Sequence, residues 1–293
     1  MSAKRKDTDY LCISAQIRSM ERNLLDRARM ERMLEAPTMD EAVRIVTELG
    51  YEAFDPASDA AMNRALLQRR VALFEDLCRR VPESTIIDVF KLKYDYHNLK
   101  VLIKSRGSDV SALLVNAGRV SAPVMERRRR DDGNWDFLDS AMAAAAKEAE
   151  RVLAQTGDPL RSVIRTLRMG RSAGFLKEFL FAGGSVSVDA AMKAAVNGEV
   201  EQTYRSTPLR QAAQVGAEAV ENGLGLTEFE KLCDDAVLRQ AGKARRIPFG
   251  VEVVIGYVAA CEAELTNLRI ILTGRMAGLK ADTIRERLRE SYV

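Results

Sequence analysis

The chain has 293 residues, of which 47% are hydrophobic and 30% are charged, a composition typical of a globular protein with one large core or two smaller ones. Its most apolar run, residues 253–261, is well short of the roughly 20 residues that cross a bilayer, and no charged and apolar leader opens the chain. The 45 basic and 42 acidic residues leave a net charge of only +3, which argues against a protein dedicated to nucleic acid.

Reactive side chains are few. Cys12, Cys78, Cys233 and Cys261 stand singly, without a CxxC pair or a histidine at metal-binding spacing, so we expect reduced and buried thiols. His97 is the only histidine, which excludes a multi-histidine metal site and leaves at most one Ser-His-Asp triad.

Apolar residues recur at spacings of three and four along the chain, which predicts helices. Three stripes carry this pattern: Ile17, Met20, Leu24 and Ala28; Ile87, Phe90, Tyr94, His97 and Val101; and Val254, Tyr257, Val258, Cys261, Leu265, Leu268 and Leu272. No convincing run of alternating apolar and polar residues predicts a strand. The sequence therefore predicts an all-α protein.

The breaks between these helices have recognisable signals. Thr38 or Asp40 is a candidate N-cap, and Ser84 after a proline is another. Residues 126–134, which include four consecutive arginines, are expected to form a polar connector. A short last helix is expected to begin at Asp282.

An internal repeat is the feature of the sequence that says most about its fold. Residues 99–103, 160–164 and 268–272 each read leucine, a basic residue, any residue and two hydrophobic residues. Residues 118–121 and 184–187 also match, since both read glycine, any residue, valine and serine. We interpret these segments as three related helical units, at about residues 1–122, 123–205 and 206–293.

The first and third segments share a polar pattern upstream. Asp95 with Asn98, and Glu264 with Asn267, each place an acid and an asparagine three residues apart on one helix face. The second segment has Pro159 instead, which a helix tolerates only in its first turn. We therefore expect the second unit to be shortened near residues 159–160, by a true deletion or by residues missing from the sequence.

The polar residues of the repeat allow three interpretations. They could bond to neighbouring helices, or they could line a surface that binds a partner, and a catalytic pair is the weakest alternative because no nucleophile accompanies them. The candidate partner-binding residues are Asp95, Asn98, Lys100, Arg161, Glu264, Asn267 and Arg269.

At these residues the chain resembles the family of C subunits of V-type and archaeal-type rotary ATPases, the counterparts of the vacuolar d subunit. The most specific block reads PFGVEVVIGY at 248–257, EAELTNLRIILTGR at 262–275 and IRERLRESYV at 284–293. Further similar positions are Tyr10, Ala15, Arg18, Glu21, Leu24, Leu25 and residues 95–100 and 175–184. The resemblance weakens at residues 159–160, where that family usually carries further helices.

The resemblance implies a non-catalytic subunit with no cofactor. Its three pseudo-equivalent helical units would surround a central cavity, as in a funnel, and a single copy would sit in a hetero-oligomeric complex. The cavity would accept the rotor shaft, which is built from the D and F subunits. The protein would lie peripherally on the cytoplasmic face of the membrane, on the proteolipid ring that moves protons or sodium ions. ATP would be hydrolysed or synthesised elsewhere, consistent with the lack of a phosphate-binding loop motif.

Three alternatives remain open. A helical-repeat scaffold with another partner would have the same fold. Nucleic-acid binding through Arg127–Arg130 is disfavoured by the flanking acids. A hydrolase that uses His97, or a thiol enzyme, is disfavoured because His97 lies on an apolar helical stripe.

Overall fold

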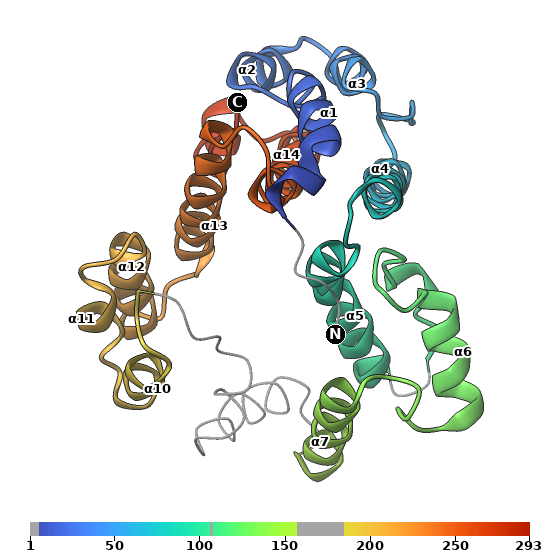
Figure 1. Cartoon of the computed structure of the whole chain (residues 1–293), viewed down its shortest axis with the longest axis vertical. Coiled ribbons are helices and arrows are strands. Elements are labelled where there is room, and N and C mark those ends of the chain that lie inside the picture. The colour runs from blue at the N-terminus through green and yellow to red at the C-terminus, as the bar shows by residue number, and fades with distance from the viewer. Residues whose placement is uncertain (1–5, 106–107, 157–184) are drawn as a thin grey trace. The chain divides into compact units, whose positions relative to one another are not determined.

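The computed structural model describes residues 6–105, 108–156 and 185–293. Every regular element in these ranges is a helix, so the all-α prediction is confirmed (Figure 1). The chain divides into two compact units, one made of Met1–Phe90 and Glu218–Val293 and the other of Lys91–Ala217. The expected threefold arrangement stays a prediction, because residues 157–184 of the second repeat lie outside the described ranges.

The first unit combines the two ends of the chain. Its elements are η1 (Asp7–Tyr10), α1 (Leu11–Glu21), α2 (Arg27–Glu35), α3 (Met39–Glu48), α4 (Asp59–Arg80), α13 (Thr227–Gly242), η3 (Lys243–Arg246), α14 (Val251–Met276) and α15 (Ala281–Arg285). Two helices cross the boundary between the units, α5 (Thr85–Ser105) and α12 (Arg210–Glu221). The second unit adds η2 (Ser111–Leu113), α6 (Ala122–Asp132), α7 (Ser140–Thr156), α10 (Val188–Asn197) and α11 (Val200–Tyr204).

Side chains at the helix starts explain several boundaries, because the first backbone N–H groups of a helix have no partner within it. Five side chains that directly precede a helix accept a hydrogen bond from the N–H three residues further on: Asp26 from Arg29, Thr38 from Glu41, Ser58 from Ala61, Asp139 from Met142 and Ser187 from Ala190. Thr38 is thus the cap of α3, and Asp40 lies in its first turn. Ser121 and Ser187, the matched serines of the repeat, both directly precede a helix.

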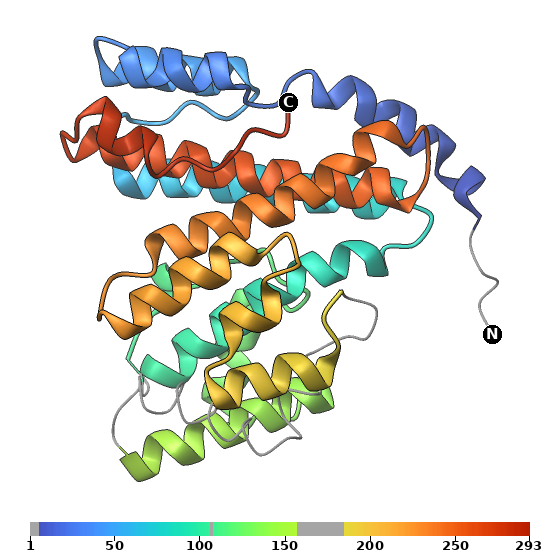
Figure 2. The same ribbon diagram turned by 90° about the vertical axis from the view of Figure 1, so that its left-hand side faces the viewer.

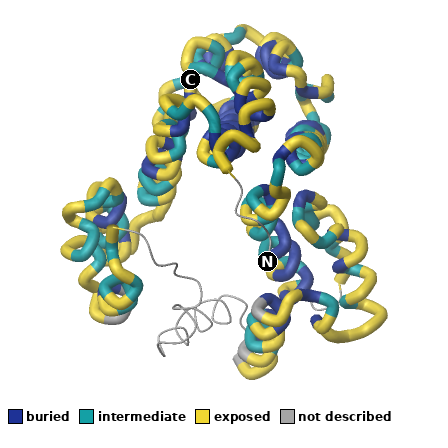
Figure 3. Tube along the Cα trace, viewed as in Figure 1, coloured by how far each residue is buried: buried dark blue, intermediate teal, exposed yellow. Residues whose placement is uncertain are grey.

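Helix α14 is the centre of the first unit. It contacts α1, α2, α3, α4, α13 and α15, and in Figure 2 it runs alongside α13. Because neighbours surround it, α14 is buried on most of its sides, as Figure 3 shows. Its residues Leu265, Leu268, Ile271 and Leu272 join a core that also draws on α2, α3, α4 and α15.

The second unit has its own core. Residues of α5, α6 and α7 pack around Trp135, which is fully buried. The Arg129 guanidinium lies 4.8 Å from the centre of the Trp135 ring and pairs with Glu150 on α7, so one arginine of the basic run covers this core.

The structure corrects three expectations. Residues 126–132 belong to helix α6 and not to a polar connector; Met, Glu and Arg are good helix formers, and the helix ends at Gly133, whose φ of +66° stops it. The opening stripe spans two helices, because α1 ends at Glu21 and Asp26 starts α2.

The third correction concerns the thiols. All four cysteines are free as expected, but only Cys261 is buried, while Cys78 and Cys233 are half-buried and Cys12 is exposed. Cys12 lies on the outer face of α1, where a small apolar side chain is tolerated singly.

We predict that Gly256→Ala destabilises the first unit. A Cβ atom there would lie 2.7 Å from the Ala244 Cβ and 3.0 Å from the Ala241 carbonyl oxygen, so α14 and η3 would have to move apart. The free energy of unfolding should fall by about 1–3 kcal/mol in denaturant titrations. Gly242→Ala is the control, because nothing lies within 4 Å of its Cβ position. Equal stability of the two variants would contradict this packing.

Candidate functional site

The asparagine of the first repeat segment binds the backbone of a distant loop. Asn98 on α5 is fully buried. Its Nδ2 donates to the carbonyl oxygen of Val115 at 2.8 Å, and the Val115 N–H donates to Asn98 Oδ1 at 2.8 Å. One side-chain amide therefore satisfies both backbone groups of one residue, as a neighbouring strand would.

The asparagine of the third repeat segment makes the same contact. Asn267 on α14 is 2% exposed. Its Nδ2 donates to the carbonyl oxygen of Arg289 at 3.2 Å, and the Arg289 N–H donates to Asn267 Oδ1 at 2.8 Å. The two units thus share an arrangement that we call the asparagine clamp: Asn98 with Val115, and Asn267 with Arg289.

The acid of the first repeat segment holds the same loop further along. The carboxylate of Asp95 is fully buried and accepts from the Val120 N–H at 3.1 Å and from Arg119 Nε at 3.0 Å. Gly118 packs so closely that a Cβ atom would lie 2.1 Å from Asp95 Oδ1. The loop can pack against Asp95 only because residue 118 has no side chain. This explains why the repeat has a glycine at this position.

The acid of the third repeat segment has different partners. Glu264 accepts from the Leu25 N–H and from the Tyr51 hydroxyl, each at 2.6 Å. It therefore joins α14 to the segment before α2 and to the segment after α3. Burial raises the pKa of Glu264, against the opposing effect of these two hydrogen bonds. Burial and the Glu264 carboxylate also raise the pKa of Tyr51.

The basic residues of the repeat are placed differently. Lys100 and Arg269 are exposed, whereas the four matched acids and asparagines are buried and bonded within the chain. A partner could contact these two basic side chains without any rearrangement of this protein. Asp95 and Asn267 are buried, so a partner could not contact them in the same way. Arg161 lies outside the described residues.

The C-terminal segment that Asn267 binds has no helix after Arg285, but further hydrogen bonds hold it in place. Three backbone contacts hold residues 286–291: Lys231 Nζ with the Glu286 carbonyl at 2.6 Å, Asp235 Oδ1 with the Glu290 N–H at 2.7 Å, and Ser291 Oγ with the Leu25 carbonyl at 3.0 Å. This segment thereby connects α13, α14 and the start of α2.

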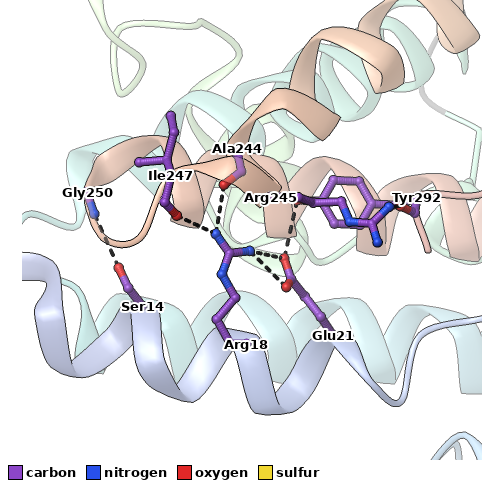
Figure 4. A network of polar contacts seen from close by, with 8 residues as sticks. All are labelled: Ser14, Arg18, Glu21, Ala244, Arg245, Ile247, Gly250 and Tyr292. Carbon is purple, nitrogen blue, oxygen red and sulfur yellow. Dashed lines mark hydrogen bonds and ion pairs between the residues drawn. The ribbon is translucent and has the colours of Figure 1, made fainter.

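Arg18 on α1 is the centre of a second polar network (Figure 4). Its Nη1 lies 2.8 Å from both carboxylate oxygens of Glu21. Its Nη2 donates to the carbonyl oxygens of Ala244 and Ile247, each at 2.7 Å. One guanidinium thus closes the η3 turn that connects α13 to α14.

The last turn of α1 also holds Tyr292. The Tyr292 hydroxyl donates to Glu21 Oε1 at 3.2 Å, and Arg245 Nη1 donates to the Tyr292 carbonyl at 2.9 Å. Burial and the Glu21 carboxylate raise the pKa of Tyr292 to about 12, so the hydroxyl stays a donor at neutral pH. Nearby, the Gly250 N–H donates to Ser14 Oγ at 3.3 Å.

The sequence does not predict this network, although Arg18, Glu21 and Tyr292 stand among the positions that carry the resemblance. The spacing of Arg18 and Glu21, three residues apart on a helix, is a signal for an ion pair. The carbonyl oxygens of Ala244 and Ile247 leave no trace in the sequence, because any residue supplies one.

Other chemistry finds little support. His97 Nε2 lies 3.1 Å from the Leu113 carbonyl oxygen, so this ring nitrogen contacts a backbone group and not a catalytic side chain. In the part of the chain that the structure describes, no group of three or more His, Cys, Asp or Glu side chains could hold a metal ion. The described helices include none that is long and apolar enough to span a membrane.

The sequence matches the family of ATP synthase (C/AC39) subunits over residues 13–162 and again over residues 135–287. This chain belongs to that family. It is therefore a non-catalytic subunit of a rotary ATPase complex, and the resemblance noted from the sequence is confirmed.

Relatives are similar over nearly the whole chain. The C subunit of the V-type sodium ATPase of Enterococcus hirae is 22% identical, over 97% of this chain and 99% of its own. The C subunit of the A-type ATP synthase of Methanocaldococcus jannaschii is 25% identical, over 95% and 86%, and that of Thermococcus gammatolerans is 22% identical, over 96% and 90%.

The first two alignments extend over 326 and 342 positions, more than the 293 residues of this chain. These relatives therefore carry residues that have no counterpart here. The expected shortening of the second repeat near residues 159–160 stays a prediction.

We predict that Asn267→Ala lowers the free energy of unfolding by about 1–3 kcal/mol, because it leaves the N–H and C=O of Arg289 without their partner. Asn98→Ala should do the same for Val115. The neighbouring substitution Arg269→Ala is the control, since this side chain is exposed and should change stability by less than about 0.5 kcal/mol. Denaturant titrations measure all three, and an asparagine variant as stable as the control would show that the clamp contributes nothing.

The raised pKa of Glu264 predicts a pH dependence. The folded state holds this proton more tightly than the unfolded state, where a glutamate has a pKa of about 4.3. The resulting stabilisation is present below about pH 4.3 and is lost as the pH rises through the folded pKa. The wild type should therefore lose stability relative to Glu264→Gln over that window. A difference between the two proteins that does not change with pH would contradict the raised pKa.

Proposed function

We propose that this chain is the central-stalk protein that couples the rotor shaft, formed by the D and F subunits, to the proteolipid ring in the membrane. It would lie peripherally on the cytoplasmic face and transmit rotation, for ATP-driven ion transport or for ion-driven ATP synthesis. The observation that carries the proposal is the match to C subunits of this family over almost the entire chain.

The internal contacts of the first unit suit such a role. A protein that transmits rotation must not yield under load, and closely packed helices with satisfied buried polar groups resist deformation. Helix α14 packs against helices from both ends of the chain, and Asn267 and Glu264 bind it to segments more than 20 residues away in sequence. The proposed function requires no reactive group.

Lys100 and Arg269 are the proposed contacts with the shaft. Both side chains are exposed, and among the described residues neither side chain makes a hydrogen bond or an ion pair. Lys100 follows Asn98 by two positions, and Arg269 follows Asn267 by two positions. The asparagine clamp therefore also sets the position of the exposed basic side chain on the protein surface. Arg161 would be the equivalent residue of the second repeat.

Co-purification tests the assembly. A tagged copy of this chain, expressed in cells that carry the rest of the complex, should retain the D and F subunits and the proteolipid ring after gentle detergent extraction. A scaffold with another partner would retain neither. Recovery of the intact protein without any other part of a rotary ATPase would overturn the proposal.

Charge reversal tests the contacts. The double variant Lys100→Glu with Arg269→Glu should bind the D/F pair at least tenfold more weakly, because two attractive charges become repulsive. Arg127→Glu is the control, since Arg127 is an exposed arginine of α6 outside the repeat motif. Isothermal calorimetry measures the affinities and circular dichroism confirms folding. Unchanged affinity of a folded double variant would remove both residues from the interface.

A further inference from the structure

A cavity of about 670 Å³ lies in the first unit, between elements from both ends of the chain. The start of α2, helix α13 and the C-terminal residues from Arg285 onward line this cavity. Figure 1 shows the C-terminus beside α2 and near one end of α13, and all three segments belong to the same compact unit. The volume is in the range of small-molecule binding sites. Lys100 and Arg269, the proposed shaft contacts, are not among the described residues that line it.

Three basic side chains in the cavity wall keep unused hydrogen-bond donors. An ammonium and a guanidinium each carry several N–H donors. Among the described residues, Lys231 Nζ donates only to one backbone carbonyl oxygen, at 2.6 Å, and forms no ion pair. Arg289 donates from Nε and Nη1, while its Nη2 has no partner in the described ranges. Arg27 is exposed and makes no hydrogen bond or ion pair with a described residue. These donors come from three different segments and face one cavity.

The acidic side chains of the wall are already engaged with protein groups. Both oxygens of Glu31 accept from Arg285, which lowers the pKa of Glu31 and keeps it ionised. Asp235 accepts from the Glu290 N–H at 2.7 Å, and the Glu290 carboxylate pairs with Arg239 at 2.7 Å. Of these three carboxylates only that of Asp235 has no cationic partner in the described part of the chain. Unpaired cations thus outnumber unpaired carboxylates among the side chains of the wall, which favours an anionic ligand.

Part of the wall is apolar. Met30 is 4% exposed and belongs to the core of the first unit, and the half-buried Leu288 packs against that core. Both line the cavity, so an anion bound there would have apolar surface beside its charged group. A guanidinium matches two oxygens of one phosphate, and an ammonium adds a point charge. A phosphate group that carries an apolar or aromatic body fits this combination of donors and apolar surface.

From this geometry we infer that the cavity binds an organic phosphate. The phosphate oxygens would accept from Arg27, Lys231 and Arg289, and the organic part would lie against Met30 and Leu288. A free phosphate ester and the headgroup of a lipid share this chemistry. The ligand would bridge α2, α13 and the C-terminal segment, so it should stabilise the first unit against unfolding. The inference does not rest on the coupling role, because rotation could be coupled with this cavity empty.

Isothermal calorimetry of the full-length chain tests the inference with three probes. Adenosine monophosphate represents the free ester, short-chain phosphatidic acid below its micellar concentration represents the lipid headgroup, and inorganic phosphate lacks the organic part. At least one of the two esters should bind saturably and about tenfold or more tightly than inorganic phosphate, because only an ester also reaches the apolar wall. The ester that binds more tightly identifies the source. No saturable binding of either ester at millimolar concentration, or equal affinity for inorganic phosphate, would overturn the inference.

Substitutions locate the bound phosphate. Arg27→Gln with Lys231→Met should weaken binding of the ester by about tenfold or more, because two positive charges are lost. Arg27→Gln alone should weaken it less, and it removes no contact within the described chain, so folding is preserved. Arg32→Gln is the matched control, since Arg32 is an exposed arginine of the same helix that does not line the cavity. Ester binding that Arg27→Gln leaves unchanged, or that Arg32→Gln weakens as much, would overturn the inference.

Thermal unfolding gives an independent readout. The ester should raise the midpoint of unfolding of the wild type and of Arg32→Gln, and it should raise that of the double variant much less. Circular dichroism before heating verifies that each variant is folded. A folded double variant whose midpoint rises as much as that of the wild type would place the ligand elsewhere and overturn the inference. Neither result bears on whether the chain retains the D and F subunits, so this inference and the proposed function can fail separately.

Discussion

A buried polar side chain that binds the backbone of a distant segment is the interaction on which both units depend. Asn98 and Asn267 each lie within an apolar helix, where an unpaired amide would cost stability. Each finds its partners in the N–H and C=O of one residue, Val115 or Arg289. The side chain is satisfied only if that segment lies in one register, so the contact sets the position of the loop relative to the helix.

The same principle extends to the ends of the chain in the first unit. Arg18 reaches two carbonyl oxygens of the turn before α14, and Tyr292 reaches the carboxylate of Glu21. Residues far apart in sequence are therefore joined by directional contacts as well as by apolar packing. A network of this kind favours one arrangement of helices over many similar ones.

The sequence predicted the helices and named the polar residues that matter, but it could not say what they bind. Apolar spacing located α14, and the acid and asparagine pattern located the clamps. The partners of Asn98 and Asn267 are backbone groups, which every residue has, so no pattern marks them. The charge of residues 126–134 predicts a connector, but the helix propensity of their arginines and glutamate decides, and residues 126–132 belong to α6. Cysteine is usually buried, but Cys12 is exposed.

We propose that this chain couples rotation to ion movement without catalysing ATP hydrolysis. The most direct measurement compares ATP hydrolysis and ion transport in membrane vesicles whose complex lacks this chain. We predict that hydrolysis continues while transport is lost, and that adding the purified protein restores transport. Ion transport per ATP that is the same with and without the chain would contradict the claim.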